Sequence, residues 1–156
     1  MTQDARFEDG REAPLNLGAL DSADLEVLSS LVQDAVFPAT EMRWDRKNRR
    51  FALLLNRVRW EDEGKTRHAP ERVQSVMMVS QVDGVASQGV PQGDKDTILS
   101  VLTVTFEETD APSGHVIVTL AGDGAIRLSV EALEISLKDV TKPYVAPSKK
   151  LPHHPA

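Results

Sequence analysis

Apolar residues recur with two different periods along this chain. Between Ser22 and Val36 they return every three or four residues, which is typical of one buried face of an α-helix. Asp21 or Ser22 can cap the first amides of that helix, and Pro38 prevents its continuation. The pattern therefore predicts one amphipathic helix of about four turns.

After Thr40 the apolar period falls to two, which is typical of strands with one buried face. Two such segments, residues 42–46 and 49–60, flank Lys47-Asn48 and indicate a β-hairpin. If Arg46 lies opposite Arg49, the hairpin brings large apolar residues together across the strands. These apolar pairs are Met42 with Leu53 and Trp44 with Phe51.

The rest of the chain continues with short alternating segments. We expect strands over Val73–Val82, Val85–Val90, Ile98–Phe106, Val116–Leu120 and Ala125–Leu137. Asp83-Gly84 and Gly122–Gly124 are the expected tight turns between neighbouring strands. In the last strand the apolar positions shift from even to odd numbers near Glu131-Ala132, which predicts a β-bulge. A helix over Val130–Val140 is the alternative.

Strands joined by short turns, with no helices between them, predict an antiparallel sheet. We expect an α+β, mainly β fold. In it, one N-terminal amphipathic helix docks on a bent antiparallel sheet, or partly closed barrel, of six to eight strands. Residues 1–19 are expected to form a flexible N-terminal segment, 20–140 a single globular domain and 141–156 a Pro/Lys-rich flexible tail.

Composition narrows the classes of function. The chain has no cysteine, which excludes disulfides, thiolate metal sites and thiol nucleophiles. Its charged N-terminus does not resemble a secretory signal, and no apolar run approaches the roughly 20 residues of a membrane span. We therefore expect a cytoplasmic protein with no membrane partner.

Charge is unevenly distributed. The net charge is −6, yet Met42–Trp60 carries seven of the eighteen Lys and Arg residues and one Asp. Six of these cations are candidate partner-binding residues: Arg46, Lys47, Arg49 and Arg50 at the turn, and Arg57 and Arg59 at the far end. The alternative is that the far-end arginines pair internally with acids such as Glu61, Asp62 or the helix carboxylates.

The best functional hypothesis is a non-enzymatic protein-interaction or adaptor domain that uses this basic hairpin. A polyanion-binding module, with RNA as the ligand, is the alternative. An enzyme with an unrecognised site near His115 or Glu131–Glu134 comes third. The chain has no phosphate-binding loop, and Asp94 with Asp96 is a weak cation-binding pattern. No catalytic residue, cofactor or metal is predicted.

Several segments together resemble a known family. They are LSSLVQDAV, RRFALLLNRVRWE, VLTVTFE and APSGHVIVTLAGDGAIRLSVEALEISLKDV. This pattern is similar to a family of small, cytoplasmic, β-rich domains of unknown function from alphaproteobacteria, over about residues 18–140. The resemblance implies a single compact domain and supplies no catalytic residues. Ala132 stands where many relatives carry a cysteine, so any chemistry of that cysteine would be lost here.

Overall fold

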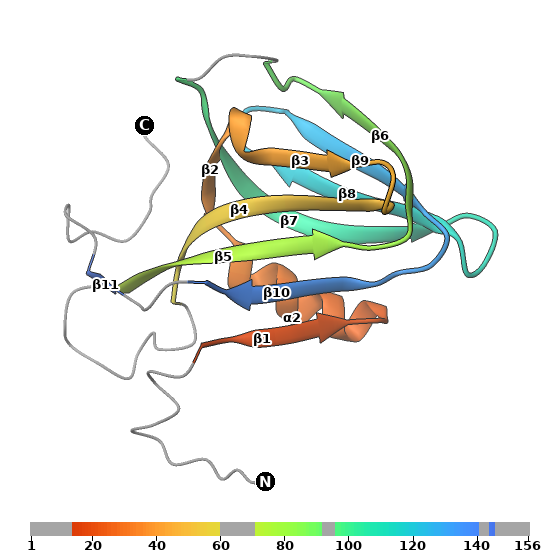
Figure 1. The fold of residues 1–156 in the computed structure, drawn as a ribbon, viewed down its shortest axis with the longest axis horizontal. Coiled ribbons are helices and arrows are strands. Elements are labelled where there is room, and N and C mark those ends of the chain that lie inside the picture. The colour runs from red at the N-terminus through yellow and green to blue at the C-terminus, as the bar shows by residue number, and fades with distance from the viewer. Residues whose placement is uncertain (1–13, 60–70, 92–95, 141–143, 146–156) are drawn as a thin grey trace, which may run out of the picture.

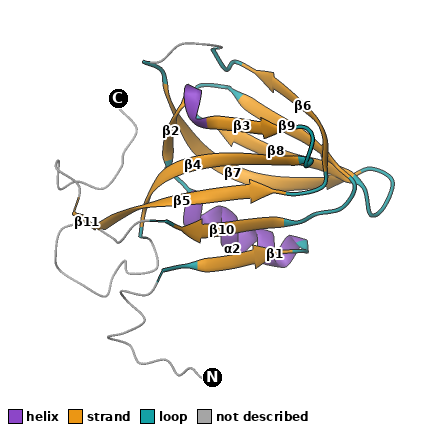
Figure 2. Ribbon diagram, in the orientation of Figure 1, coloured by secondary structure: helices purple, strands orange, loops and turns teal. Residues whose placement is uncertain are grey.

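The computed structural model describes residues 14–59, 71–91, 96–140 and 144–145. These residues form eleven strands, one α-helix and one short 3-10 helix (Figures 1 and 2). In chain order the elements are β1 (Asn16–Ala19), α2 (Ser22–Val32), β2 (Val36–Pro38), η1 (Ala39–Glu41), β3 (Met42–Asp45), β4 (Arg50–Val58), β5 (Glu71–Val79), β6 (Val82–Gln88), β7 (Ile98–Glu108), β8 (Gly114–Leu120), β9 (Ala125–Val130), β10 (Ile135–Asp139) and β11 (Tyr144–Val145).

All of these strands belong to one antiparallel sheet that is not closed. Its order is β1-β10-β5-β4-β2-β7-β8-β9-β6, with β3 beside β4 and β11 beside β5. We term β1, β10, β5, β4 and β3 the β4 half, and β7, β8, β9 and β6 the β8 half; β2 joins them. Figure 1 shows the sheet bent so that the β4 half lies in front of the β8 half. The predicted mainly β fold with an N-terminal helix is confirmed.

Helix α2 begins and ends for local reasons. Asp21 caps it, because its Oδ1 accepts a hydrogen bond from the Asp24 N–H at 2.8 Å. The helix ends at Val32, before the predicted Val36, because Val36 already pairs with Asn56 of β4 and with β7. Its inner face buries three aliphatic side chains against the sheet: Leu25, Leu28 and Val32.

The helix also covers part of one strand edge. Along β7, residues 98–100 pair with β2, and beyond them the same edge meets α2. There the Ser29 Oγ accepts a hydrogen bond from the Val104 N–H at 2.9 Å. A backbone donor at a sheet edge is thereby satisfied by the helix.

The predicted hairpin register is confirmed. Met42 lies opposite Leu53 and Trp44 opposite Phe51, and all four side chains belong to or pack against the core. Arg49 adopts a φ of 59° at the turn, and its N–H donates to the Arg46 carbonyl at 3.2 Å.

Two connections pass side by side between the halves at one corner of the molecule. Ser80-Gln81 links β5 to β6, and residues 131–134 link β9 to β10. The Ser80 N–H donates to the Glu134 carbonyl at 2.9 Å, and the Glu131 N–H donates to the Gln81 carbonyl at 3.1 Å. The β5–β10 ladder therefore continues through the corner into the β6–β9 ladder.

This corner corrects two predictions. Asp83-Gly84 is not a turn between paired strands: it lies inside β6, and Gly84 pairs with Ser129 of β9. The chain instead turns at Ser80-Gln81, where Gln81 has a φ of 58°. The predicted bulge near Glu131 is instead a break between two strands. β9 pairs with β8 and β6, whereas β10 pairs with β1 and β5. The alternative helix over 130–140 does not form.

Both terminal segments contribute strands that the sequence pattern missed. Asn16–Ala19 lies within the segment expected to be flexible, yet it pairs with β10. Tyr144–Val145, in the predicted tail, pairs with Arg72 and Glu71 of β5. Residues 1–13, 141–143 and 146–156 lie outside the described residues, so the predicted domain boundaries remain predictions.

We predict that Gly114, the first residue of β8, cannot be replaced by alanine without loss of stability. An added Cβ would lie 2.6 Å from Cζ of Phe106 and still closer to the Glu107 carbonyl oxygen, which the β7–β8 ladder holds in place. Gly114→Ala should lower the free energy of unfolding in urea by about 1–3 kcal/mol. At Gly18 the nearest atom is 3.9 Å away, so Gly18→Ala is the matched control. Equal effects of the two substitutions would contradict this account.

Candidate partner-binding surface

Arg57 lies inside the protein, not on its surface. It continues the inward row of β4, and its side chain has no exposed area. Its Nε donates to Ser75 Oγ at 3.0 Å, and its Nη2 donates to Asp139 Oδ1 at 3.0 Å. Ser75 Oγ in turn donates to the same Oδ1 at 2.7 Å. The second oxygen, Oδ2, accepts the Leu15 N–H at 2.8 Å.

Arg59 lies beside this network and is also largely buried. Its Nη1 donates to Glu71 Oε1 at 3.0 Å, and its N–H donates to the Glu71 carbonyl at 2.9 Å. Neither arginine therefore offers a guanidinium group to a partner, and we leave Arg57 and Arg59 out of the proposed surface.

Among the described residues, Arg57 pairs with Asp139 and Arg59 pairs with Glu71, so both arginines pair internally, as the alternative expected. Glu61 and Asp62 lie outside the described residues, and the helix carboxylates Asp24 and Glu26 are exposed. One signal could have identified Asp139: it continues the odd-numbered buried positions Ile135 and Leu137. A carboxylate on the buried face of one strand indicates a cation on the buried face of another.

Arg49 is tied to the corner between the halves. Its Nη2 lies 2.5 Å from Asp83 Oδ1 and 3.0 Å from Glu131 Oε1, and the hydrogen bonds to Glu131 and then Asp83 raise the pKa of the guanidinium. The Arg49 carbonyl also accepts the Val82 N–H at 2.9 Å. Arg49 thus attaches the hairpin turn to β6.

The remaining hairpin cations, Arg46, Lys47 and Arg50, are exposed, and no ion pair joins them to another described residue. Asp45 shapes the turn that carries them, because its carboxylate accepts from the Asn48 side chain at 2.9 Å and from the Asn48 N–H at 3.2 Å. These bonds lower the pKa of Asp45. Their contribution to stability is therefore complete above the ordinary carboxyl range and is lost as the pH falls through the lowered pKa.

Apolar side chains continue from this turn along the outward side of β4 and β5. An antiparallel sheet usually presents polar residues to solvent, but four adjacent outward positions here are apolar and only partly buried. Ladder pairing places Ala52 beside Met78 and Leu54 beside Val76. We term these four residues the apolar quartet.

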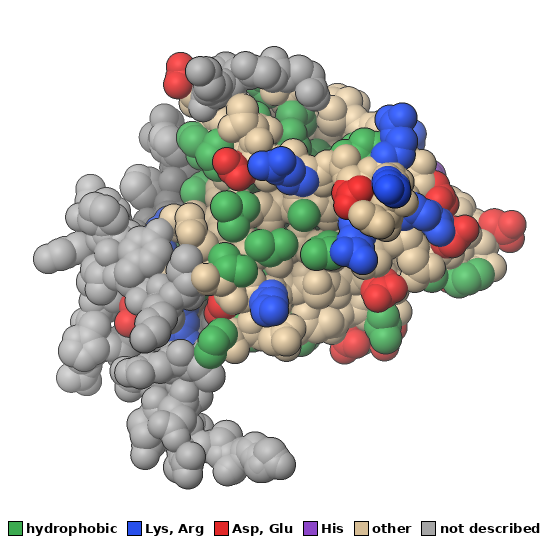
Figure 3. Space-filling model, in the orientation of Figure 1, with side chains coloured by type: hydrophobic (Ala, Val, Ile, Leu, Met, Phe, Trp, Pro, Cys, Tyr) green, Lys and Arg blue, Asp and Glu red, His purple; other side chains and the backbone are tan. Residues whose placement is uncertain are grey.

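Exposed cations surround the apolar quartet. Arg43 of β3 pairs with Ala52, Arg50 precedes the quartet on β4, and Lys138 of β10 pairs with Val76. Figure 3 shows hydrophobic side chains over β4 and β5, with Lys and Arg side chains and some Asp and Glu side chains around them. We term this surface the β4 face: the apolar quartet with Arg43, Arg46, Lys47, Arg50 and Lys138.

The positions considered for catalysis have other neighbours. His115 on β8 lies opposite Glu107 and Ser129, and no hydrogen bond from its imidazole to either residue is found among the described residues. Glu131 contacts Arg49, and Glu134 Oε1 accepts from the Gln81 amide at 2.9 Å, so both glutamates hold the corner. No group of three potential metal ligands comes together among the described residues, and Asp94 lies outside them.

The family comparison covers most of the chain. Residues 15–154 match a family described as protein of unknown function (DUF2948). The chain belongs to the DUF2948 family. This confirms the expected membership in a family of unknown function. The match includes all of β1 and β11, whereas the resemblance at 18–140 covers only the end of β1 and none of β11. No curated protein and no solved structure matches the chain. No helix within the described ranges has the length and apolar character needed to cross a membrane.

We predict that the buried network is essential for stability. Asp139→Leu leaves the Arg57 guanidinium in the core without its carboxylate and should lower the free energy of unfolding by about 3–5 kcal/mol. Adding Arg57→Met removes the stranded charge, so the double variant should be more stable than Asp139→Leu alone in urea denaturation. Lys138→Ala, at the exposed neighbouring position, is the control. A single variant within about 0.5 kcal/mol of the wild type would contradict the prediction.

Proposed function

We propose that this DUF2948 protein is a non-enzymatic protein-interaction domain that docks its partner on the β4 face. The observation that supports this is the apolar quartet framed by exposed cations. Protein interfaces combine an apolar centre with a polar rim, and Met78 can adapt its shape to a partner. The complementary partner surface has an apolar centre and an acidic rim, because opposite charges guide association.

A polyanion such as RNA is a poorer match for this surface. Phosphate groups need cations but no apolar centre, and single-stranded RNA binding relies on aromatic side chains that stack with bases. The outward positions of β3, β4, β5 and β10 in the described ranges carry no aromatic residue. RNA binding remains the second candidate function because Arg46, Lys47 and Arg50 concentrate positive charge at one turn.

We also propose that the protein acts in the cytoplasm of an alphaproteobacterium. The family resemblance supports the source. The absence of cysteine is compatible with a reducing compartment. Cell fractionation tests the location, and recovery in the periplasmic fraction would contradict it.

Site-specific photo-crosslinking in cells of the source organism tests the proposed function. With p-benzoylphenylalanine in place of Val76 in the apolar quartet, we expect a discrete protein adduct. The same crosslinker at Val27, on the exposed side of α2, should not give that adduct. Identical adducts from both positions would reject the β4 face as the binding surface.

Charge reversal then tests the role of the cations. The triple variant Arg43→Glu, Arg46→Glu and Arg50→Glu should abolish the Val76 adduct and lower the melting temperature only slightly, because these exposed side chains form no ion pair with described residues and only Arg50 lies opposite an acid, Asp45. Arg50→Glu and Arg127→Glu change the net charge equally, but Arg127 is not part of the β4 face. Only Arg50→Glu should therefore weaken the adduct. An adduct that survives the triple variant contradicts the proposal, and an RNase-sensitive adduct favours RNA.

A further inference from the structure

β6 is an edge of the sheet that lacks the usual protection. It pairs only with β9 among the described elements, and Figure 1 shows it at the margin of the β8 half. Natural edge strands are commonly protected by charged residues, proline, a β-bulge or a covering element. The irregularity in β6 lies between Val82 and Gly84, so residues 84–88 pair with β9 in a regular register. Residues 84–88, GVASQ, contain no charge and no proline, and Asp83 before them is bound to Arg49. By contrast, α2 covers the edge of β7.

Hydrogen-bond alternation identifies the backbone groups available at this edge. The Leu120 N–H donates to the Gly124 carbonyl at 2.8 Å. Because hydrogen-bonded pairs alternate along an antiparallel ladder, the backbone groups of even-numbered residues in β9 bond to β8, and those of odd-numbered residues bond to β6. Ala86, opposite Arg127, therefore bonds to β9. The N–H and C=O groups of Val85 and Ser87 point away from β9, toward the edge.

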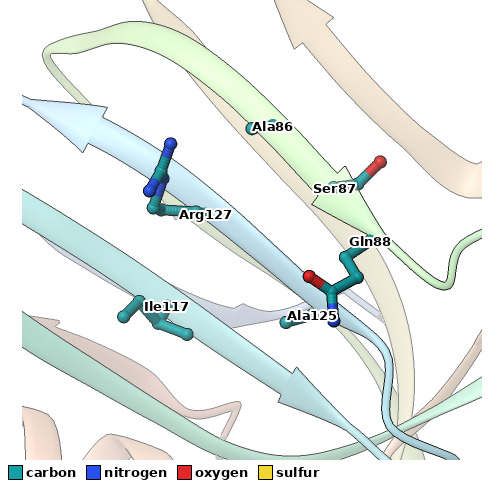
Figure 4. A pocket seen from close by; sticks show the side chains of 6 residues that line it. All are labelled: Ala86, Ser87, Gln88, Ile117, Ala125 and Arg127. Carbon is teal, nitrogen blue, oxygen red and sulfur yellow. The ribbon is translucent and has the colours of Figure 1, made fainter.

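A hollow lined by one positively charged side chain, that of Arg127, lies beside this edge. It has a volume of about 340 Å³ and is lined by Ala86, Ser87, Gln88, Ile117, Ala125 and Arg127 (Figure 4). Arg127 is exposed and forms no ion pair with any described residue. The small side chains of Ala86 and Ala125 leave the space beside its guanidinium open.

The register defines what a further strand would place over this hollow. A residue paired opposite Ala86 would share its face with Arg127, two strand spacings or about 10 Å away. A glutamate side chain and an extended arginine together cover that distance across the small Ala86. An uncharged residue at the same position would leave the guanidinium without a partner.

We propose that β6 binds an extended peptide as an additional antiparallel strand, with a glutamate of the peptide held by Arg127. Main-chain hydrogen bonds to Val85 and Ser87 supply affinity, and Arg127 supplies selectivity. The same division holds where other proteins bind a peptide as an added strand. A second copy of this chain fits less well, because two β6 edges would bring two Arg127 side chains to one face with no acid in residues 84–88.

Fluorescence anisotropy with the full chain tests the selectivity. The probe is a labelled, capped peptide of sequence KTVEVTK, whose glutamate can face Arg127 while the flanking valines face inward. The matched peptide carries glutamine instead of glutamate. We expect the glutamate peptide to bind about threefold more tightly, as for an exposed ion pair. Arg127→Gln should remove this preference while the glutamine peptide still binds.

A proline substitution tests the strand pairing. Ser87→Pro removes a donor at the edge without affecting the β6–β9 ladder, so affinity for both peptides should fall at least about tenfold. Ser87→Thr keeps the donor and should bind as the wild type does. The melting temperature verifies folding of both variants.

Amide exchange of the wild-type chain gives a readout independent of the proline variant. Peptide binding should slow exchange at Val85 and Ser87, whereas Gly84 and Ala86 are already protected by β9. The proposal is overturned by unchanged exchange at Val85 and Ser87, by a folded Ser87→Pro variant that binds normally, or by equal affinity for both peptides. Absence of an anisotropy change with the peptide in large excess also overturns it. A peptide-free dimer that Ser87→Pro dissociates would assign the edge to a second copy instead.

Discussion

The burial of the Arg57 guanidinium is the constraint on which the β4 half depends. A charge without exposed area is tolerated only where hydrogen bonds and an opposite charge compensate for lost hydration. Here the compensation comes from Ser75 of β5 and Asp139 of β10, and Asp139 also accepts the N–H of Leu15 just before β1. A shift of one residue in β4, β5 or β10 would turn its side chain to the opposite face, and a shift in β1 would move the Leu15 N–H away from the Asp139 carboxylate. One buried cation therefore fixes the register of four strands.

The same register determines the outer surface. Because alternate residues face opposite sides, the row that places Leu55, Ser75 and Asp139 inside places its neighbours outside. Those neighbours include the apolar quartet and Lys138. The charge that stabilises the interior and the charges around the β4 face thus belong to one arrangement. Their roles differ because the Arg57 charge is buried, whereas the charges around the β4 face are exposed to water.

Local patterns predicted what local interactions decide. The Asp21 cap and the pairing of Trp44 with Phe51 depend on residues close in sequence, and both were predictable. The prediction of a turn at Asp83-Gly84 was wrong because the pairing of β6 with β9 overrides the local turn preference of these two residues. The break after Val130 was visible only as a change of phase, since a strand that changes partners and a bulged strand produce the same sequence pattern.

The candidate surface was predictable in part for the same reason. Arg46, Lys47 and Arg50 were identified from the hairpin, whereas Arg43, Lys138 and the apolar quartet were not. A signal existed in the uninterrupted apolar runs FALLL and VMMV, which indicate strands with two apolar faces. Neither run specifies which strands lie beside it. Lys138 joins the surface only through the pairing of β10 with β5.

The pairing of β1 with β10 has a consequence for synthesis on the ribosome. Arg57 precedes Asp139 by 82 residues, and Leu15 precedes it by 124. At cellular rates of translation, the nascent chain carries Arg57 for on the order of ten seconds before its carboxylate exists. During this interval the β5 edge that β10 will occupy has no partner, and the guanidinium must remain hydrated. The β4 half therefore cannot form stepwise from its N-terminal strand; it assembles when β10 emerges.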